Sequence, residues 1–230
     1  MNKRKIFTMV CMLFIFVLII SSFINAEEKI NLPPIKIENS LHRALNKRRS
    51  IRDFRNKSLK FSQISMLLWA AYGRKMGGID AITSATHMVA SPNELYPLKI
   101  YLMVTEGGVE DLKAGLYSYQ PDTHTLEKLT KTIAIQRKIL NILNSQRNLK
   151  EAPVFILIGY DKKISLGREL TFYEVGLSAQ NIHLICEDLG IGTVIFTSSQ
   201  LEKILNGIFP DIEIITLMPV GYPKWQLRAF

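Results

Sequence analysis

Three short polar segments hold the residues whose types and spacing suit a phosphorylated ligand. Residues 48–52 carry three arginines and a serine on a tight path at the end of a predicted helix. Residues 91–93 form a polar loop of small groups, and residues 193–198 supply a strand end followed by a predicted helix N-terminus. Guanidinium groups and helix N-termini both bind phosphate. The candidates in the first two segments are Arg48, Arg49, Ser50, Arg52, Ser91, Pro92 and Asn93.

The sequence lacks the motifs of several other kinds of binding and catalytic site. Gly190 and Gly192 are not followed by the third glycine of a dinucleotide-binding loop, and neither a G-x-S-x-G nor an H-E-x-x-H pattern occurs. The four histidines are scattered without metal-ligand spacing, so we predict no metal site. On a predicted long helix, His183 is interpreted as a hydrogen-bonded core histidine and Cys186 as a small buried hydrophobe.

The charge distribution also favours an anionic ligand. The chain has a formal net charge of +9, and its basic residues are concentrated between Arg43 and Lys60, where Asp53 is the only acid. Such a cluster attracts phosphate, nucleic acid or anionic lipid, and a solvated helix face is the open alternative. If the chain is exported, nucleic acid is not an expected partner.

The N-terminal residues predict export. Lys3, Arg4 and Lys5 precede an apolar run from Ile6 to Ile20, and Ala26 stands where a signal peptidase would cut. We therefore predict a signal peptide over residues 1–26, a linker over 27–40 and one domain over 41–230. An uncleaved membrane anchor is the alternative, because this run is close to the minimum span of a bilayer. Both interpretations place the domain outside the cytoplasm, in the periplasm or at the cell surface.

A long helix followed by a buried strand must position these segments. Between residues 174 and 189, apolar residues recur every three or four positions, which predicts a helix with one buried face. Gly176 and Ala179 lie one turn apart, so another backbone can approach there. Gly190 and Gly192 are expected to end the helix in a left-handed conformation. Residues 193–196 then form a β-rich run, interpreted as a strand from the middle of a sheet.

The remaining elements mix helices and strands without regular alternation. Helices are expected at 41–47, at 63–72 with Ser62 as the cap, and at 133–144; strands are expected at 98–104, 154–159 and 214–220, with a hairpin at 115–129. This pattern favours an α+β fold with a central mixed or antiparallel sheet flanked by helices.

Six strings in order resemble the FMN-dependent nitroreductase family over residues 41 to 223. They are RRSIRDF, LLWAAYG, SPNELYPLKIYLMV, GLYSYQPDTHTLEKL, EVGLSAQNIHLICEDLGIGTV and LMPVGYP. The strings GLYSY…H-x-L and S-x-x-x-x-Y-P are similar to the azoline-oxidase-like (SagB-type) branch. This branch relies on a Lys-Tyr pair that the chain lacks, so the resemblance favours a general reductase or dehydrogenase over azole formation.

The resemblance implies a nitroreductase-like fold, a domain-entwined homodimer, and FMN bound at the interface by both subunits. It implies contacts to the flavin from residues 48–52, and from Ser91, Pro92 and Asn93 of the other subunit. It further places four residues near the flavin ring, namely Ile195, Phe196, Thr197 and Ser198. A basic residue near the C-terminus, Arg228 or Lys224, is expected to complete the phosphate site.

The implied activity is hydride transfer through flavin N5 to or from a small organic substrate, with NAD(P)H or another electron donor. Export raises an alternative, because an unfolded chain cannot carry FMN across the membrane. The old flavin cleft would then hold a small anionic ligand or peptide in a flavin-free binding module. A third interpretation is a membrane-tethered domain whose basic segment touches lipid headgroups.

Overall fold

The computed structural model describes residues 2–24, 30–75, 86–130, 132–143, 148–165, 167–199, 203, 205, 209 and 211–224. The chain divides into two compact units, Met1–Ile37 and Glu38–Phe230. The first unit contains helix α1 (Lys3–Ile24) and an extended segment. Among the described residues, no helix has both the length and the hydropathy that a bilayer crossing requires.

The second unit is built on an antiparallel sheet, which confirms the α+β prediction. Within the described residues, six strands follow the order β3-β2-β1-β4-β6-β5, and every neighbouring pair is antiparallel. The predicted hairpin is formed by β2 and β3. The strands are β1 (Leu98–Val104), β2 (Gly115–Gln120), β3 (Thr125–Lys128), β4 (Val154–Asp161), β5 (Gly192–Thr193) and β6 (Ile212–Gly221).

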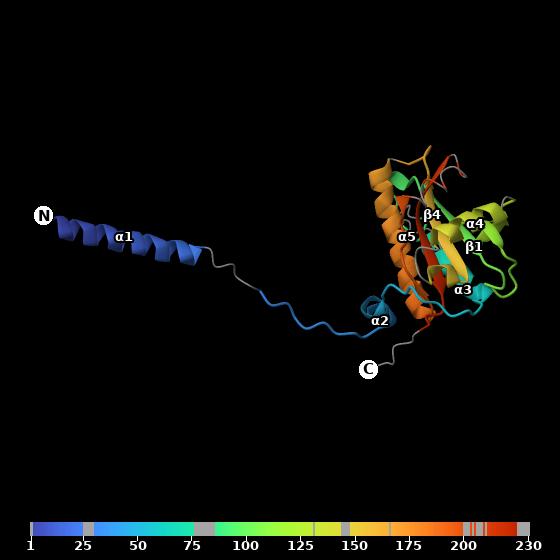
Figure 1. Cartoon of the computed structure of the whole chain (residues 1–230), viewed down its shortest axis with the longest axis horizontal. Helices are drawn as coiled ribbons and strands as arrows, with labels where there is room; N and C mark the ends of the chain where they lie inside the picture. Colours follow the sequence, from blue (N-terminus) through green and yellow to red (C-terminus); the bar gives the residue numbers. More distant parts are fainter. Residues whose placement is uncertain are drawn as a thin grey trace. The chain divides into compact units, whose positions relative to one another are not determined.

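Helices cover both faces of the sheet, so the central strand β4 is apolar and buried on both sides. Ile156 and Ile158 belong to the core under helices α3 (Phe61–Tyr72) and α5 (Arg168–Asp188). Phe155 and Leu157 alternate with them and belong to the core under α4 (Thr132–Leu143). Figure 1 shows α5 and α4 on opposite sides of the sheet. The shorter helices are α2 (Ser40–Lys47), η1 (Pro92–Glu94) and η2 (Leu149–Glu151).

Two helix starts differ from the sequence prediction. Helix α5 begins at Arg168, well before the expected start at residue 174. In its first turns Thr171 and Glu174 are buried while the apolar side chains are exposed, so the apolar pattern does not mark the buried face. Helix α3 begins at Phe61, so Ser62 lies inside the first turn and is not the cap. Instead, the Gln63 side chain turns back and its Oε1 accepts a hydrogen bond of 3.0 Å from the Lys60 backbone N–H.

The strand after α5 was also misplaced by the sequence prediction. Strand β5 covers only Gly192–Thr193 and lies at the edge of the sheet, while β6 occupies the position between β4 and β5. Of the two glycines, only Gly190 has the expected left-handed backbone, with φ +66°. Gly192 serves a close approach, because a Cβ there would lie 2.5 Å from the Ile51 side chain.

Candidate functional site

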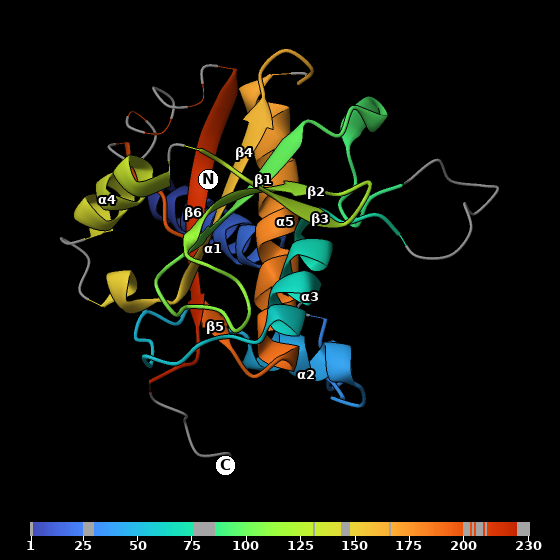
Figure 2. The ribbon, with the colours of Figure 1, turned by 90° about the vertical axis from the view of Figure 1, so that its right-hand side faces the viewer.

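The basic segment 48–52 lies directly against β5. Helix α2 ends at Lys47, and the chain then runs parallel to β5, with Ser50 bridged to Thr193. The backbone N–H of Ile51 donates to the Thr193 carbonyl oxygen at 2.8 Å. This pairing brings the first and third polar segments of the sequence together, and Figure 2 shows α2 and β5 at the same end of α5.

The three guanidinium groups of this segment are available to a ligand. Arg48 is half-buried, whereas Arg49 and Arg52 are exposed, as is Ser50. Within the described part of the chain, no acidic side chain pairs with any of the three arginines. Unpaired guanidiniums grouped beside a hydroxyl suit an anion such as phosphate.

His183 lies close enough to this segment for the charge of Arg48 to affect its pKa. It is buried on α5, and burial, followed by the positive charge of Arg48, lowers its pKa to about 4. The position of His183 in the core is as predicted, but the described residues include no hydrogen-bond partner for its ring. Cys186, one turn further on, is buried as predicted, and burial raises the pKa of its thiol.

The depressed pKa of His183 predicts that the fold loses stability in acid. The folded state favours the neutral ring, so the stabilisation is complete above the unfolded pKa of 6.5 and is lost as the pH falls towards about 4. The full loss is on the order of 3 kcal/mol, from about 1.4 kcal/mol per pKa unit. Urea unfolding at several pH values should show this decline, and His183→Leu should flatten it.

The matched control for this experiment is His42→Leu, because His42 is only half-buried on α2. This variant should keep the acid-dependent decline of the parent protein. An unchanged profile in His183→Leu would show that another group carries the pH dependence.

A cavity of about 530 Å³ lies between α5 and the segment that follows β5. We call it the α5 cavity. Ile195, Thr197 and Ser198 line it, so three of the four predicted ring-contacting residues are brought together there. The fourth, Phe196, pairs with Leu217 through two backbone hydrogen bonds of 2.9 Å, and its side chain packs on the α4 core. Alternation along extended backbone accounts for this difference.

The opposite wall of the α5 cavity is a face of the long helix. It leaves space at Gly176, where an added Cβ would meet no atom within 4 Å. The small pair predicted at 176 and 179 therefore makes room for a cavity and not for a backbone. The lining residues that the sequence did not indicate are Arg168, Phe172, Val175, Ser199, Ile215 and Thr216.

Arg168 forms part of the cavity rim and is fixed by two neighbours. Its Nε donates to Glu213 Oε1 at 2.7 Å, and its guanidinium lies 4.8 Å from the centre of the Phe172 ring. The cavity therefore combines an apolar floor with a hydroxyl-bearing wall and one oriented cation. Such a lining can hold a flat ring that has polar atoms along one edge.

The predicted loop residues Ser91, Pro92 and Asn93 lie elsewhere. Ser91 Oγ donates a hydrogen bond of 2.9 Å to Glu174 Oε1 on α5. Nine residues separate Glu174 from His183, which corresponds to opposite faces of the helix and about 13 Å along its axis. One chain therefore does not bring Ser91 to the face of α5 that carries the cavity and His183.

Only one of the two C-terminal phosphate candidates lies within the described residues. Arg228 lies outside the described residues. Lys224 is exposed, and its backbone N–H donates to the Asp53 carbonyl oxygen at 2.9 Å. The C-terminal segment therefore lies next to the end of the basic segment.

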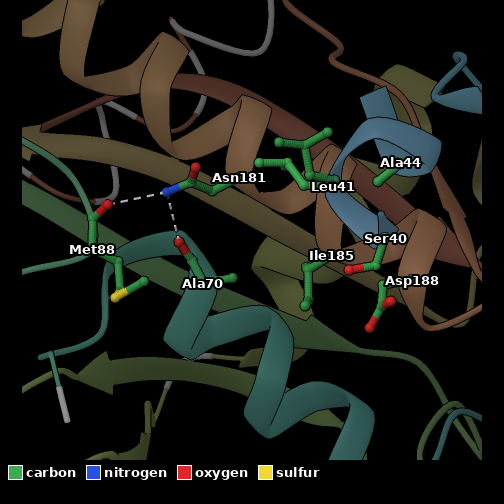
Figure 3. A pocket seen from close by; sticks show the side chains of 9 residues that line it. Ser40, Leu41, Ala44, Ala70, Met88, Asn181, Ile185 and Asp188 are labelled. Atoms are coloured by element: carbon green, nitrogen blue, oxygen red, sulfur yellow. Dashed lines mark hydrogen bonds between the residues drawn. The ribbon is translucent and has the colours of Figure 1, made fainter. Parts of the chain in front are cut away.

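A second pocket, of about 340 Å³, lies where α2 and α3 meet α5. Figure 3 shows Asn181 reaching from α5 to the carbonyl oxygens of Ala70 and Met88, with hydrogen bonds of 3.1 and 3.2 Å. Leu41 of α2 borders the pocket and is 55% exposed. The neighbouring outer faces carry further exposed apolar side chains, namely Leu45 on α2 and Leu170, Tyr173 and Leu177 on α5.

Comparison with known proteins identifies relatives over most of the chain. The model of the Nitroreductase family matches residues 45–222. A Methanocaldococcus jannaschii protein described as a nitroreductase is 31% identical over 203 residues, which are 84% of this chain and 96% of that protein.

Solved structures share the fold at lower sequence identity. One is described as a nitroreductase of Anabaena variabilis, with a TM-score of 0.64 and 21% identity over 80% of this chain. This chain spans only 38% of that longer chain. Another, from Desulfovibrio desulfuricans, was solved in complex with FMN and has a TM-score of 0.58 and 14% identity, covering 84% of this chain and 93% of that one.

Proposed function

The chain belongs to the nitroreductase family, and on this premise we propose that it is an FMN-dependent oxidoreductase acting on a small organic substrate. The observation that carries the proposal is that one segment, which begins at Thr193, contacts both the basic segment and the α5 cavity. The unpaired arginines of residues 48–52 pair with the strand end at Thr193, and the next residues of that segment line the α5 cavity. A phosphate-binding group is thus joined by a short stretch of backbone to a ring-sized cavity.

The residues present fit FMN. The space at Gly176 and the apolar side chains of α5 suit the flat isoalloxazine ring. The hydroxyls of Thr197 and Ser198 suit its polar edge. Arg48 and Arg52, with Ser50 between them, suit the phosphate and the ribityl chain.

Bound FMN supplies two-electron hydride chemistry at its N5 atom. The protein's own groups orient the cofactor and stabilise charge. Fixed cations near the ring favour the reduced, anionic form of a flavin, and the arginines of residues 48–52 are cations without an acidic partner among the described residues. Arg168 is oriented at the rim, where it can meet an anionic or polar substrate.

We further propose that the site is completed in a homodimer. Ser91 faces away from the cavity within one chain, so its predicted contact requires a second copy. The exposed stripe of Leu170, Tyr173 and Leu177 on α5 supplies an apolar surface for that copy, with Tyr173 71% exposed. Each FMN would then lie between the basic segment of one subunit and the Ser91 loop of its partner.

The finer assignments rest on the sequence. The SagB-type branch is supported by the GLYSYQPDTHTLEKL string, which forms the β2–β3 hairpin, and the missing Lys-Tyr pair favours a general reductase or dehydrogenase. NAD(P)H is the proposed electron donor. Export remains part of the proposal on the strength of the basic and apolar leader, with FMN acquired outside the cytoplasm.

Colour and size test the proposal together. The chain purified in the presence of FMN should be yellow, keep a flavin spectrum through gel filtration and elute with the mass of a dimer. Leu177→Lys places a charge on the exposed stripe, so it should give a monomer that releases flavin. Light scattering and absorbance at each elution volume measure both properties.

A second charge placed away from the stripe provides the control. The control position is Ala134, which is exposed on α4, on the other side of the sheet. Gln136 on the same helix is unsuitable because its side chain donates a hydrogen bond to the Val104 carbonyl oxygen. Ala134→Lys should remain a yellow dimer. A colourless parent protein that takes up no FMN would overturn the oxidoreductase assignment and favour a flavin-free binding module.

A further inference from the structure

The hydroxyl of Ser91 is held by two partners within its own chain. Its proton is donated to Glu174 Oε1 at 2.9 Å. In turn, Ser91 Oγ accepts a hydrogen bond from the Tyr96 backbone N–H at 2.9 Å, which closes the loop of residues 91–96. A serine hydroxyl has one proton and two lone pairs. Ser91 Oγ is therefore left with one lone pair and no proton for a ligand.

The loop that Ser91 closes is conformationally strained. Asn93, Glu94 and Tyr96 all have left-handed backbones, with φ of 53°, 57° and 49°. This region is unfavourable for residues with a Cβ, and each instance costs on the order of 1 kcal/mol. Two backbone hydrogen bonds, from Glu94 N–H to the Ser91 carbonyl oxygen at 3.1 Å and from Leu95 N–H to the Pro92 carbonyl oxygen at 3.4 Å, form the turn within this loop. The Ser91 side chain adds the hydrogen bond that ties Tyr96 to the start of the loop.

Glu174 is an unusual residue to find behind this loop. It is 3% exposed, and its Oε2 is buried without a hydrogen-bond partner among the described residues. Burial raises the pKa of this carboxyl, while the hydrogen bond from Ser91 opposes the increase. A buried carboxyl with one unsatisfied oxygen destabilises the fold, so packing alone does not account for it.

We propose that Glu174 is a positioning residue for the flavin site, which orients the Ser91 hydroxyl and holds the loop of residues 91–96 for the cofactor of the partner subunit. The inference rests on the proposed function. Because Glu174 takes the only proton of Ser91, the loop presents an acceptor to the cofactor. It can therefore pair with an N–H or hydroxyl group of FMN and not with a ring carbonyl oxygen.

The test compares Glu174→Ala, Glu174→Gln and Ser91→Ala in the full chain, with FMN as the titrant. Glu174→Ala should raise the FMN Kd about 10-fold, as expected for loss of a hydrogen bond to a charged group. Glu174→Gln keeps an oxygen acceptor for the Ser91 proton, so its Kd should stay within about 3-fold of the parent value. The double variant of Glu174→Ala and Ser91→Ala should bind FMN no more weakly than Ser91→Ala alone, because Glu174 acts only through the Ser91 hydroxyl.

Amide hydrogen exchange of Tyr96 in the flavin-free protein provides a readout that does not depend on FMN. Glu174→Ala should increase exchange at this amide about 10-fold, and Glu174→Gln should preserve its protection. Ser178→Ala is the matched control, because Ser178 lies one turn further on α5 and its Oγ is also buried without a partner among the described residues. This control should change neither the Kd nor the exchange rate.

The outcomes separate the two proposals. If the parent protein binds FMN and Glu174→Ala binds it equally tightly, the positioning role is wrong while the proposed function stands. If Glu174→Gln loses as much affinity as Glu174→Ala, the role is also wrong, since an acceptor alone would not rescue it. A parent protein that binds no FMN overturns the proposed function instead, and the cofactor part of this inference with it.

Discussion

Gly176→Phe is expected to weaken flavin binding strongly while the chain stays folded. Gly176 lines the α5 cavity, and no atom lies within 4 Å of an added Cβ, so a larger side chain can enter the cavity without displacing the core. A phenyl group there would occupy the space proposed for the isoalloxazine ring. Forcing both into one site costs several kcal/mol, so the FMN Kd should rise on the order of 100-fold. A fluorescence titration with FMN measures the effect.

Gly176→Ala is the matched control for this substitution. The methyl group meets no neighbour, and alanine is favoured over glycine within a helix by roughly 0.5–1 kcal/mol. The alanine variant should therefore bind FMN like the parent protein and unfold at a slightly higher urea concentration. Tight FMN binding by a folded Gly176→Phe would mean that the ring lies outside the α5 cavity.

Removing Arg48 and Arg52 together should have a comparable effect on FMN. Neither guanidinium has an acidic partner among the described residues, so their loss should leave the fold largely unchanged. Each substitution to alanine should weaken binding by at least about 1.5 kcal/mol, as for a charge-assisted hydrogen bond. The double variant should lose roughly 100-fold in affinity if the two contacts are independent. The same FMN titration measures this loss of affinity. The FMN Kd of the parent protein should depend more strongly on salt than the Kd of the double variant.

A second signal reports on Arg48 alone. Its charge contributes to the low pKa of His183, so Arg48→Ala should raise that pKa, which can be followed by NMR titration of the ring protons. Arg137→Ala, at an exposed position on α4, is the control for loss of positive charge and should change neither property. FMN binding that is unaffected in the double arginine variant would place the phosphate elsewhere.

The fold and family were largely predictable because local patterns of apolar residues, turns and short motifs indicate them. The apolar run of β4 predicts a strand buried on both faces, and the hairpin of β2 and β3 is indicated by the turn between them. The helices ended where a glycine or a turn indicates, as at Gly73 and Gly190. The start of α5 was missed because Arg168–Tyr173 has no clear apolar period, although Thr171 is buried.

The sequence by itself determined the family, the basic segment around Ser50 and the strings that resemble flavin-binding motifs, because residue type and spacing are local properties. Tertiary structure alone decided that β5 is an edge strand against which Ser50 lies, and that Phe196 turns into the core while its neighbours line a cavity. It also decided that the Ser91 loop packs on Glu174, whereas the charge of Arg48 reaches His183 on the opposite face of α5. These relations depend on how distant segments pack around one helix, and no spacing along the chain encodes which face each segment will meet.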